Sequence, residues 1–302
     1  MTILTVFLDP ILPVFAIMAI GFVMGRGGAV TVEAARHINR LAMMVFVPVA
    51  VFGLTAKADV RSYAPGPLIL YAAVEVILFA GGFALARKVF GRPADEAILL
   101  AFGAIFANNL FFTLPIALLL YGESGIGALT AVLTLDSTVT FGAAAIAMQI
   151  ISLGRAKPLA VAKSLARTPL LQAIVLGILI NASGLPLPGP LDTFVAFNGV
   201  AAAPVALFAL GVVLSKTPLV PDRLVLTFGF SKLIVMPALL ALGLAVLVPG
   251  TQMANQFVLA SAGPAGAMSF SLAMLHGVRT DAIAQLIIWS SLGSLLTLAV
   301  LA

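Results

Sequence analysis

The stretch FANNLFFTLPIALLLYG, from Phe106 to Gly122, places two adjacent amides and a proline inside an apolar run. Proline removes a backbone donor and clashes with the preceding helical turn, and a buried Asn is costly unless it finds hydrogen-bond partners. Asn108, Asn109 and Pro115 therefore predict a helix that is interrupted at membrane depth. Irregular backbone at that depth is tolerated where it is buried in protein or lines a cavity.

The composition indicates an integral membrane protein. Of 302 residues, 62% are hydrophobic and 9% charged, whereas an ordinary soluble domain is about 25% charged. Ten apolar runs are each long enough to approach the roughly 20 residues that a membrane helix needs. We expect the spans at 9–26, 38–56, 66–88, 96–121, 126–153, 168–184, 191–215, 222–248, 252–276 and 281–301. The predicted fold class is an all-α membrane protein with ten transmembrane helices.

The basic residues predict the orientation. Lys57 and Arg61 are the only Lys or Arg residues on one side of the predicted membrane, and Lys232 falls within a span, so 13 of the 16 lie in loops on the other side. Cytoplasmic loops carry the excess of Lys and Arg. We therefore expect an inner-membrane protein with both termini outside the cytoplasm. The scattered charges give no face for nucleic acid.

The prolines indicate an internal repeat. A shift of 156 residues superposes three of them at matching places in their spans: Pro13 on Pro169, Pro48 on Pro204 and Pro65 on Pro221. We interpret the chain as two five-span halves, residues 1–153 and 168–302, joined by a cytoplasmic loop at 154–167. Because five is odd, the second half is inverted, as in many secondary transporters.

The fourth span of the second half contains a segment where we also expect the helix to be interrupted. The stretch SAGPAGAMS, Ser261 to Ser269, is rich in small residues and contains Pro264. We expect the breaks in spans 4 and 9 to form the substrate site together. The candidate substrate-binding residues are Asn108, Asn109, Pro115, Ser261, Gly263, Pro264 and Ser269. The alternative is that the prolines are simple kinks and that the Asn side chains hold helices together.

Three ionisable residues lie well within predicted spans, away from the span ends: Glu75, Asp136 and Lys232. Intramembrane charges are costly and often functional, so these are candidates for coupling transport to H⁺ or Na⁺. The repeat places Glu75 and Lys232 at nearly symmetric levels, where they could approach each other. A structural ion pair is the alternative. Asp136 has its own alternative, because the neighbouring Thr134, Ser137, Thr138 and Thr140 could satisfy it.

Several functions lack support in the sequence. The chain has no Cys and none of the motifs of a phosphate-binding loop, a zinc protease or an esterase. We expect neither an enzyme nor a cofactor or metal centre. Two rivals to a carrier remain open, a cation/proton antiporter of related architecture and a receptor that binds a ligand without moving it. The expected partners are a small organic anion, H⁺ or Na⁺, lipid and, as a possibility, a second copy.

The chain resembles the auxin efflux carrier family, which includes plant carriers and bacterial members described as malonate or organic-acid transporters. The resemblance extends along the chain: LPVFAIMAIGFVMGR (12–26), LAMMVFVPVAVFGL (41–54), NNLFFTLPIALLLYG (108–122), SKLIVMP (231–237) and DAIAQLIIWSSLGSLLTL (281–298). In span 4, as in that family, an Asn precedes a Pro by seven residues and Tyr-Gly follows. Thr113 departs from it, because Gly is usual there.

The resemblance implies a particular mechanism. It implies that spans 4 and 9 cross at their breaks and that spans 1, 2, 6 and 7 form a scaffold. Spans 3–5 and 8–10 would move against this scaffold as an elevator. It further implies that a substrate carboxylate binds Asn108 and the backbone around Pro264.

Overall fold

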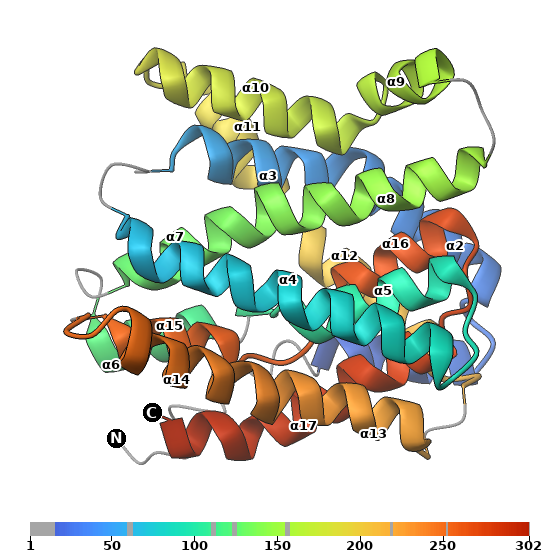
Figure 1. Ribbon diagram of the computed structural model, residues 1–302. Coiled ribbons are helices and arrows are strands. Elements are labelled where there is room, and N and C mark those ends of the chain that lie inside the picture. The colour runs from blue at the N-terminus through green and yellow to red at the C-terminus, as the bar shows by residue number, and fades with distance from the viewer. Residues whose placement is uncertain are drawn as a thin grey trace.

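A computed structural model describes residues 16–58, 63–109, 113–122, 126–154, 158–217, 220–251 and 253–301. These residues form helices and connecting turns (Figure 1). Within them, the one strand-like contact is an isolated bridge between Ala107 and Ala265. The predicted fold class, an all-α membrane protein, is confirmed.

Six helical runs are long and apolar enough to cross a membrane. Three of them are single helices or pairs of consecutive helices: α4 (Pro65–Lys88), α11 (Gly189–Gly199) with α12 (Ala202–Leu214), and α17 (Asp281–Leu301). Each of the other three consists of two α-helices joined by a π-helical turn. The first is α2 (Val32–Leu41), the turn η1 (Ala42–Phe46) and α3 (Val47–Ala56), and the second is α7 (Gly127–Leu135), the turn η5 (Asp136–Thr140) and α8 (Phe141–Leu153). The third is α13 (Arg223–Phe230), the turn η6 (Ser231–Val235) and α14 (Met236–Leu247). π-Helical turns are rare and frequently occur at functional sites.

Six is fewer than the ten spans that the apolar runs predict. Two further apolar helices are shorter, one at Ala16–Arg26 and α10 (Pro169–Ser183). The remaining two predicted spans are each divided into shorter helices: α5 (Ala94–Ile105) and α6 (Leu114–Tyr121), and α15 (Ala254–Ser261) and α16 (Met268–His276). The short helix α9 (Pro158–Ala166) connects the halves of the chain.

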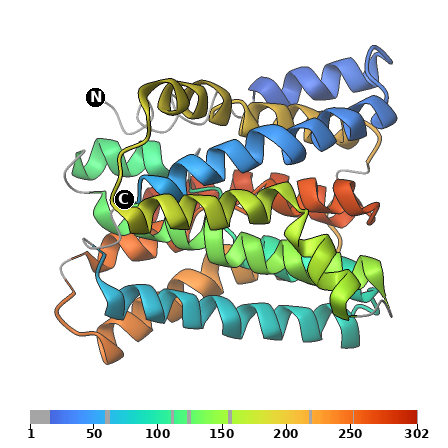
Figure 2. The same ribbon diagram turned by 90° about the horizontal axis from the view of Figure 1, so that it is seen from above.

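The helices pack in two groups. In one group α3 packs against α10 and α11, and α2 packs against α12. In the other, α4 packs against α5 and α14, α14 against α15, and α13 against α17. Figure 2 shows α4 and α14, which are far apart in the sequence, side by side.

Small residues allow the closest helix crossing in the first group. A Cβ atom added to Gly21 would lie 2.3 Å from the carbonyl oxygen of Phe208, and one added to Gly211 would lie 2.1 Å from that of Met18. The helix at Ala16–Arg26 and α12 therefore touch backbone to backbone. Such close approach through glycine is typical of helix pairs in membranes, where van der Waals contact drives association.

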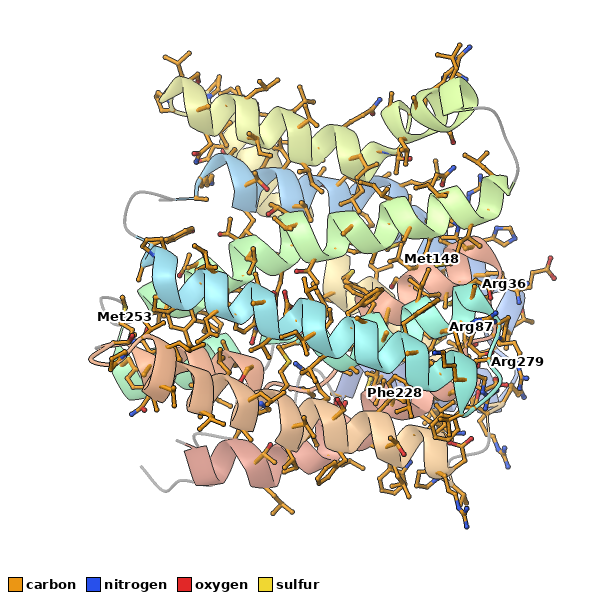
Figure 3. The ribbon with its side chains drawn as sticks, viewed as in Figure 1. Arg36, Arg87, Met148, Phe228, Met253 and Arg279 are labelled. Carbon is orange, nitrogen blue, oxygen red and sulfur yellow. The ribbon has the colours of Figure 1, made fainter. Side chains whose placement is uncertain are left out.

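Basic side chains from different connections gather at one end of the molecule. Figure 3 shows Arg36, Arg87 and Arg279 at this end, whereas Met253 lies at the opposite end. Arg92 also pairs here with Glu96 at 3.3 Å and with Asp222 at 3.7 Å. The predicted positive loops are thus neighbours in space.

Candidate functional site

The two interrupted segments lie against each other in the core. After α5 ends at Ile105, the N–H of Asn108 donates to the carbonyl oxygen of Pro264 at 2.8 Å. In return, the N–H of Gly266 donates to the carbonyl oxygen of Phe106 at 2.9 Å. This short antiparallel pairing satisfies backbone groups that the helices leave free, which is obligatory away from water.

Small residues in the second break make this pairing possible. A Cβ atom on Gly266 would lie 2.4 Å from a ring carbon of Phe106. One on Gly263 would lie 2.6 Å from Thr113 Oγ1 and 3.3 Å from Asn109 Oδ1. The glycines are therefore required for close approach of the two segments.

Lys232, in η6, links the ends of both interrupted helices. Its side chain is fully buried, and its Nζ donates to the carbonyl oxygen of Ile105 at 3.0 Å and to that of Ser261 at 3.1 Å. Ile105 is the last residue of α5, and Ser261 is the last residue of α15. Carbonyl groups at helix C-termini are unpaired and carry partial negative charge. One ammonium group therefore stabilises both ends.

The predicted approach of Lys232 to Glu75 is not a direct ion pair. Among the described residues, no carboxylate oxygen lies within 4.0 Å of the Lys232 Nζ. Glu75 instead accepts a hydrogen bond from Thr140 Oγ1 at 2.8 Å. Both Glu75 and Asp136 lie near enough to interact electrostatically with Lys232. The three N–H groups of Lys232 are instead directed to the two backbone carbonyls and to Met236 Sδ, at 3.3 Å.

Asp136, in η5, contacts the first break and is buried. Asn109 Nδ2 donates to Asp136 Oδ2 at 3.3 Å. Of the neighbouring hydroxyl groups named as an alternative partner, Thr134 donates to the carbonyl oxygen of Thr130 and Thr138 to that of Thr134. Asp136 therefore faces the broken segment and not its own helix.

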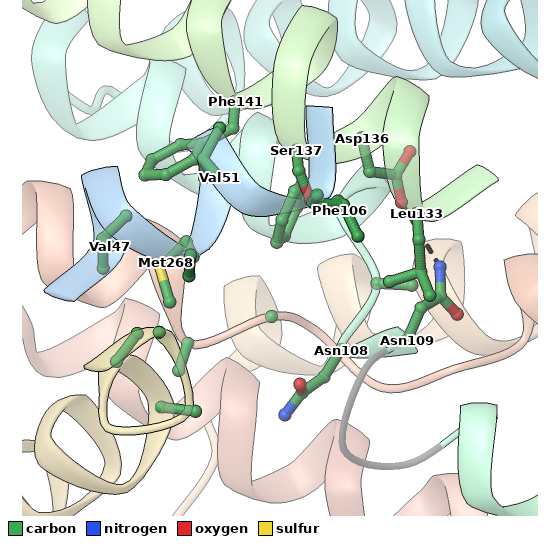
Figure 4. Close-up of a pocket in the computed structure, with 18 of the residues that line it drawn as sticks. Val47, Val51, Phe106, Asn108, Asn109, Leu133, Asp136, Ser137, Phe141 and Met268 are labelled. Atoms are coloured by element: carbon green, nitrogen blue, oxygen red, sulfur yellow. Dashed lines mark hydrogen bonds between the residues drawn. The ribbon is translucent and has the colours of Figure 1, made fainter. Parts of the chain in front are cut away.

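A cavity of about 120 Å³ lies between the breaks and the first helix group (Figure 4). Its polar lining is Asn108, Asn109, Asp136 and Ser137. Its apolar lining includes Val47 and Val51 of α3, Ala202 and Leu207 of α12, Phe106, Phe141 and, at the start of α16, Met268. The cavity thus combines a few polar groups with an apolar wall, as ligand sites do.

The other predicted site residues lie around this cavity. Ser261 Oγ and Ser269 Oγ each donate to a carbonyl of their own segment, at 2.7 Å and 3.0 Å. Gly263 and Pro264 contact the first break as described above. Pro115 is the second residue of α6. Within the described residues of the second break, Gly266, Ala267 and Met268 line the cavity, whereas Ser261, Gly263, Pro264 and Ser269 do not.

Three further polar residues belong to the site, although none of them was predicted as a site residue. Tyr71 is fully buried one helical turn before Glu75 and interacts with Asp136 and Asn109. Thr113 faces Gly263. Ser290, in α17, accepts a hydrogen bond from the N–H of Ala265 at 3.0 Å. The i,i+4 spacing of Tyr71 and Glu75 was a usable signal, because such pairs share one helix face.

The fold and the buried polar site define a multi-pass membrane transport protein. The family model described as "Membrane transport protein" matches residues 6–153 and 152–302, so the chain belongs to this family, that of the auxin efflux carriers.

Named relatives are of similar length. A Rhizobium meliloti (strain 1021) protein named "Putative malonate transporter" is 25% identical over 78% of this chain and 76% of its own. An Escherichia coli (strain K12) protein named "Uncharacterized transporter YfdV" is 27% identical over 92% of this chain and 90% of its own. A Methanothermobacter thermautotrophicus protein named "Uncharacterized transporter" is 23% identical over 96% of this chain and 95% of its own.

Proposed function

We propose that this protein is a secondary carrier that moves a small organic anion, such as a carboxylate, across the inner membrane. The observation that carries this proposal is the cavity beside the paired breaks, which Asn108 and the first residues of α16 line. Substrate sites of secondary transporters are typically formed where discontinuous helices meet near the bilayer midplane.

The anion is expected to bind at the positive end of α16. Ala267 and Met268, at its N-terminus, line the cavity, and helix N-termini favour negative charge. Asn108 adds a side-chain amide. Ser261, Gly263, Pro264 and Ser269 shape the second break, and Pro115 helps to keep the first break open.

Asp136 requires that the anion be accompanied by a cation. It is the one ionisable residue in the described cavity lining, and an anion beside an ionised carboxylate would be repelled at short range in a medium of low dielectric constant. H⁺ or Na⁺ at Asp136 and Glu75 removes this repulsion. We therefore assign these two residues to ion coupling, and assign to Lys232 the tethering of the two breaks.

The proposed transport cycle uses the two helix groups as rigid bodies. Ten spans in two inverted halves, 1–153 and 168–302 with a loop at 154–167, would give an elevator in which α4–α8 and α13–α17 slide past α2, α3 and α10–α12. The division of packing contacts between these groups supports this proposal. The basic end with Arg36, Arg87 and Arg279 would face the cytoplasm.

Uptake into proteoliposomes tests the function. Malonate is the first substrate to try because the Rhizobium meliloti relative carries that name, followed by a panel of mono- and dicarboxylates. We expect saturable uptake of at least one acid, driven by an inward gradient of H⁺ or Na⁺. Cation flux that needs no organic acid would instead indicate an antiporter, and ligand binding without any uptake would indicate a receptor.

A further inference from the structure

Five buried oxygen atoms around the first break lack a hydrogen bond of standard geometry: Tyr71 Oη, Glu75 Oε1, Asn109 Oδ1, Thr113 Oγ1 and Asp136 Oδ1. Their side chains are at most 3% exposed. A buried polar group without a partner is destabilising, so native structures contain few of them. Five in one region call for a common explanation.

These oxygen atoms belong to one connected cluster. Asn109 joins Asp136 through its amide nitrogen at 3.3 Å, while its own oxygen faces Gly263. Thr113 Oγ1 faces the same glycine, since the added Cβ would lie 2.6 Å from it. Glu75 and Tyr71 both interact with Asp136. Because Gly263 has no side chain, the second break can lie directly against the Asn109 and Thr113 oxygens.

We propose that this cluster is a sodium site, with Asn109, Thr113 and Asp136 supplying oxygen ligands and Glu75 a second negative charge. The proposal rests on the function proposed above and names its coupling ion. Hard cations take carboxylate, carbonyl and other oxygen ligands. Within the described residues, no group of three His, Asp or Glu side chains could hold a metal ion of another kind, and the chain has no Cys.

Charge favours a monovalent ion. With Lys232 protonated and both carboxylates ionised, the cluster carries one net negative charge in an apolar interior, and Na⁺ makes it neutral. Lys232 does not serve the free oxygens, because its three N–H groups are directed to the carbonyls of Ile105 and Ser261 and to Met236 Sδ. A bound proton would satisfy a carboxylate but would leave the Asn109 and Thr113 oxygens without a partner.

The site lies beside the substrate cavity, because Asn109 and Asp136 contribute to both. Sodium bound there would offset the repulsion between Asp136 and an anion. Coupling of two ligands is reciprocal, so the anion must strengthen sodium binding by the same factor.

Thermal unfolding of the purified, detergent-solubilised protein tests the site. NaCl is titrated against choline chloride at constant ionic strength and pH, with KCl as a further arm. A ligand that binds the folded state raises the unfolding temperature by mass action. We expect a saturable rise that is specific for Na⁺. An unfolding temperature that is the same in NaCl, KCl and choline chloride would overturn the proposal.

Variants of Thr113 locate the ion. Thr113→Val removes one ligand oxygen and should weaken the apparent Na⁺ affinity about tenfold. Thr113→Ser keeps the oxygen and should respond as the unmodified protein does. Thr130→Val is the matched control, because Thr130 only donates to the carbonyl of Ile126 in its own helix. If Thr113→Val folds and retains the full Na⁺ response, the site is wrong.

Carboxylate binding measured in choline chloride separates the two proposals. Carboxylates that bind and are transported equally well without Na⁺ would refute the sodium site and leave the carrier intact. A Na⁺ response in a protein that neither binds nor transports any organic acid would refute the carrier instead.

Discussion

The N–H of Asn108 donates to the carbonyl oxygen of Pro264 at 2.8 Å, although 156 positions separate the two residues in the chain. This bond joins two interrupted helices at the place where their own backbone hydrogen bonding fails. The cavity, the buried carboxylates and Lys232 are all arranged around it.

Replacing Lys232 should destabilise the protein strongly. Lys232→Met keeps the length of the side chain but leaves the carbonyls of Ile105 and Ser261 unpaired and two buried carboxylates without a nearby cation. Breaking a buried charge interaction in this way costs about 3–5 kcal/mol. The control is Lys57→Met, because Lys57 pairs with Asp192 at an exposed site, where a salt bridge is worth about 1 kcal/mol or less. The measurement is the free energy of unfolding from SDS titration. Equal losses in Lys232→Met and Lys57→Met would contradict the tethering role of Lys232.

Adding one methyl group at the second break should separate the paired segments. Gly266→Ala forces the ring of Phe106 to move, and overpacking of this kind costs about 1–3 kcal/mol. Phe106→Leu should recover part of the loss in the double variant. Gly81→Ala is the control, since nothing lies within 4 Å of the added atom. If Gly266→Ala behaves like Gly81→Ala in thermal unfolding, the close approach is not needed.

Neutralising Asp136 should uncouple the anion from the cation. Asp136→Asn keeps the shape of the side chain but removes the negative charge beside the cavity. We expect carboxylate binding to lose most of its dependence on Na⁺ or H⁺, which for typical coupling is about 5- to 150-fold. Asp192→Asn, at an exposed ion pair, should keep the dependence. A full dependence in Asp136→Asn would remove this residue from the coupling mechanism.

The orientation can be tested with single cysteines in this Cys-free chain. Glu33 and Asn255 are both exposed, Glu33 in the first turn of α2 and Asn255 in the first turn of α15. In intact cells, Asn255→Cys should react with an impermeant thiol reagent. Glu33→Cys should react with the same reagent only after the membrane has been permeabilised. The opposite pattern would place both termini in the cytoplasm.

Part of this site could be predicted from the sequence because its signals are local. Two amides and a proline in an apolar run mark the first break, and the small residues around Pro264 mark the second. Glu75, Asp136 and Lys232 stand out because charge is rare in membrane helices. The auxin efflux carrier resemblance added the family and is confirmed by the match along the chain.

The partners of these residues could not be predicted. Lys232 binds two backbone carbonyls, and a carbonyl has no signature in the sequence. Hydroxyl groups of its own helix were one alternative for Asp136, but Asp136 begins the π-helical turn η5 and accepts a hydrogen bond from Asn109. Gly263 and Gly266 look like ordinary small residues until the opposing segment is placed 2.4–2.6 Å from their missing side chains.

The most direct test of the carrier site is the affinity of Asn108→Ala for the carboxylate that stabilises the unmodified protein most. If the Asn108 side chain binds the carboxylate group, its loss removes a hydrogen bond to a charged group, worth about 1.5–3 kcal/mol, or roughly 10- to 150-fold in affinity. Asn198→Ala is the control, because Asn198 donates to the carbonyl of Phe194 in α11. Titration calorimetry should show this loss for Asn108→Ala with an unchanged unfolding temperature. Equal affinity in the two variants and in the unmodified protein would mean that the paired breaks are a packing feature and that the substrate binds elsewhere.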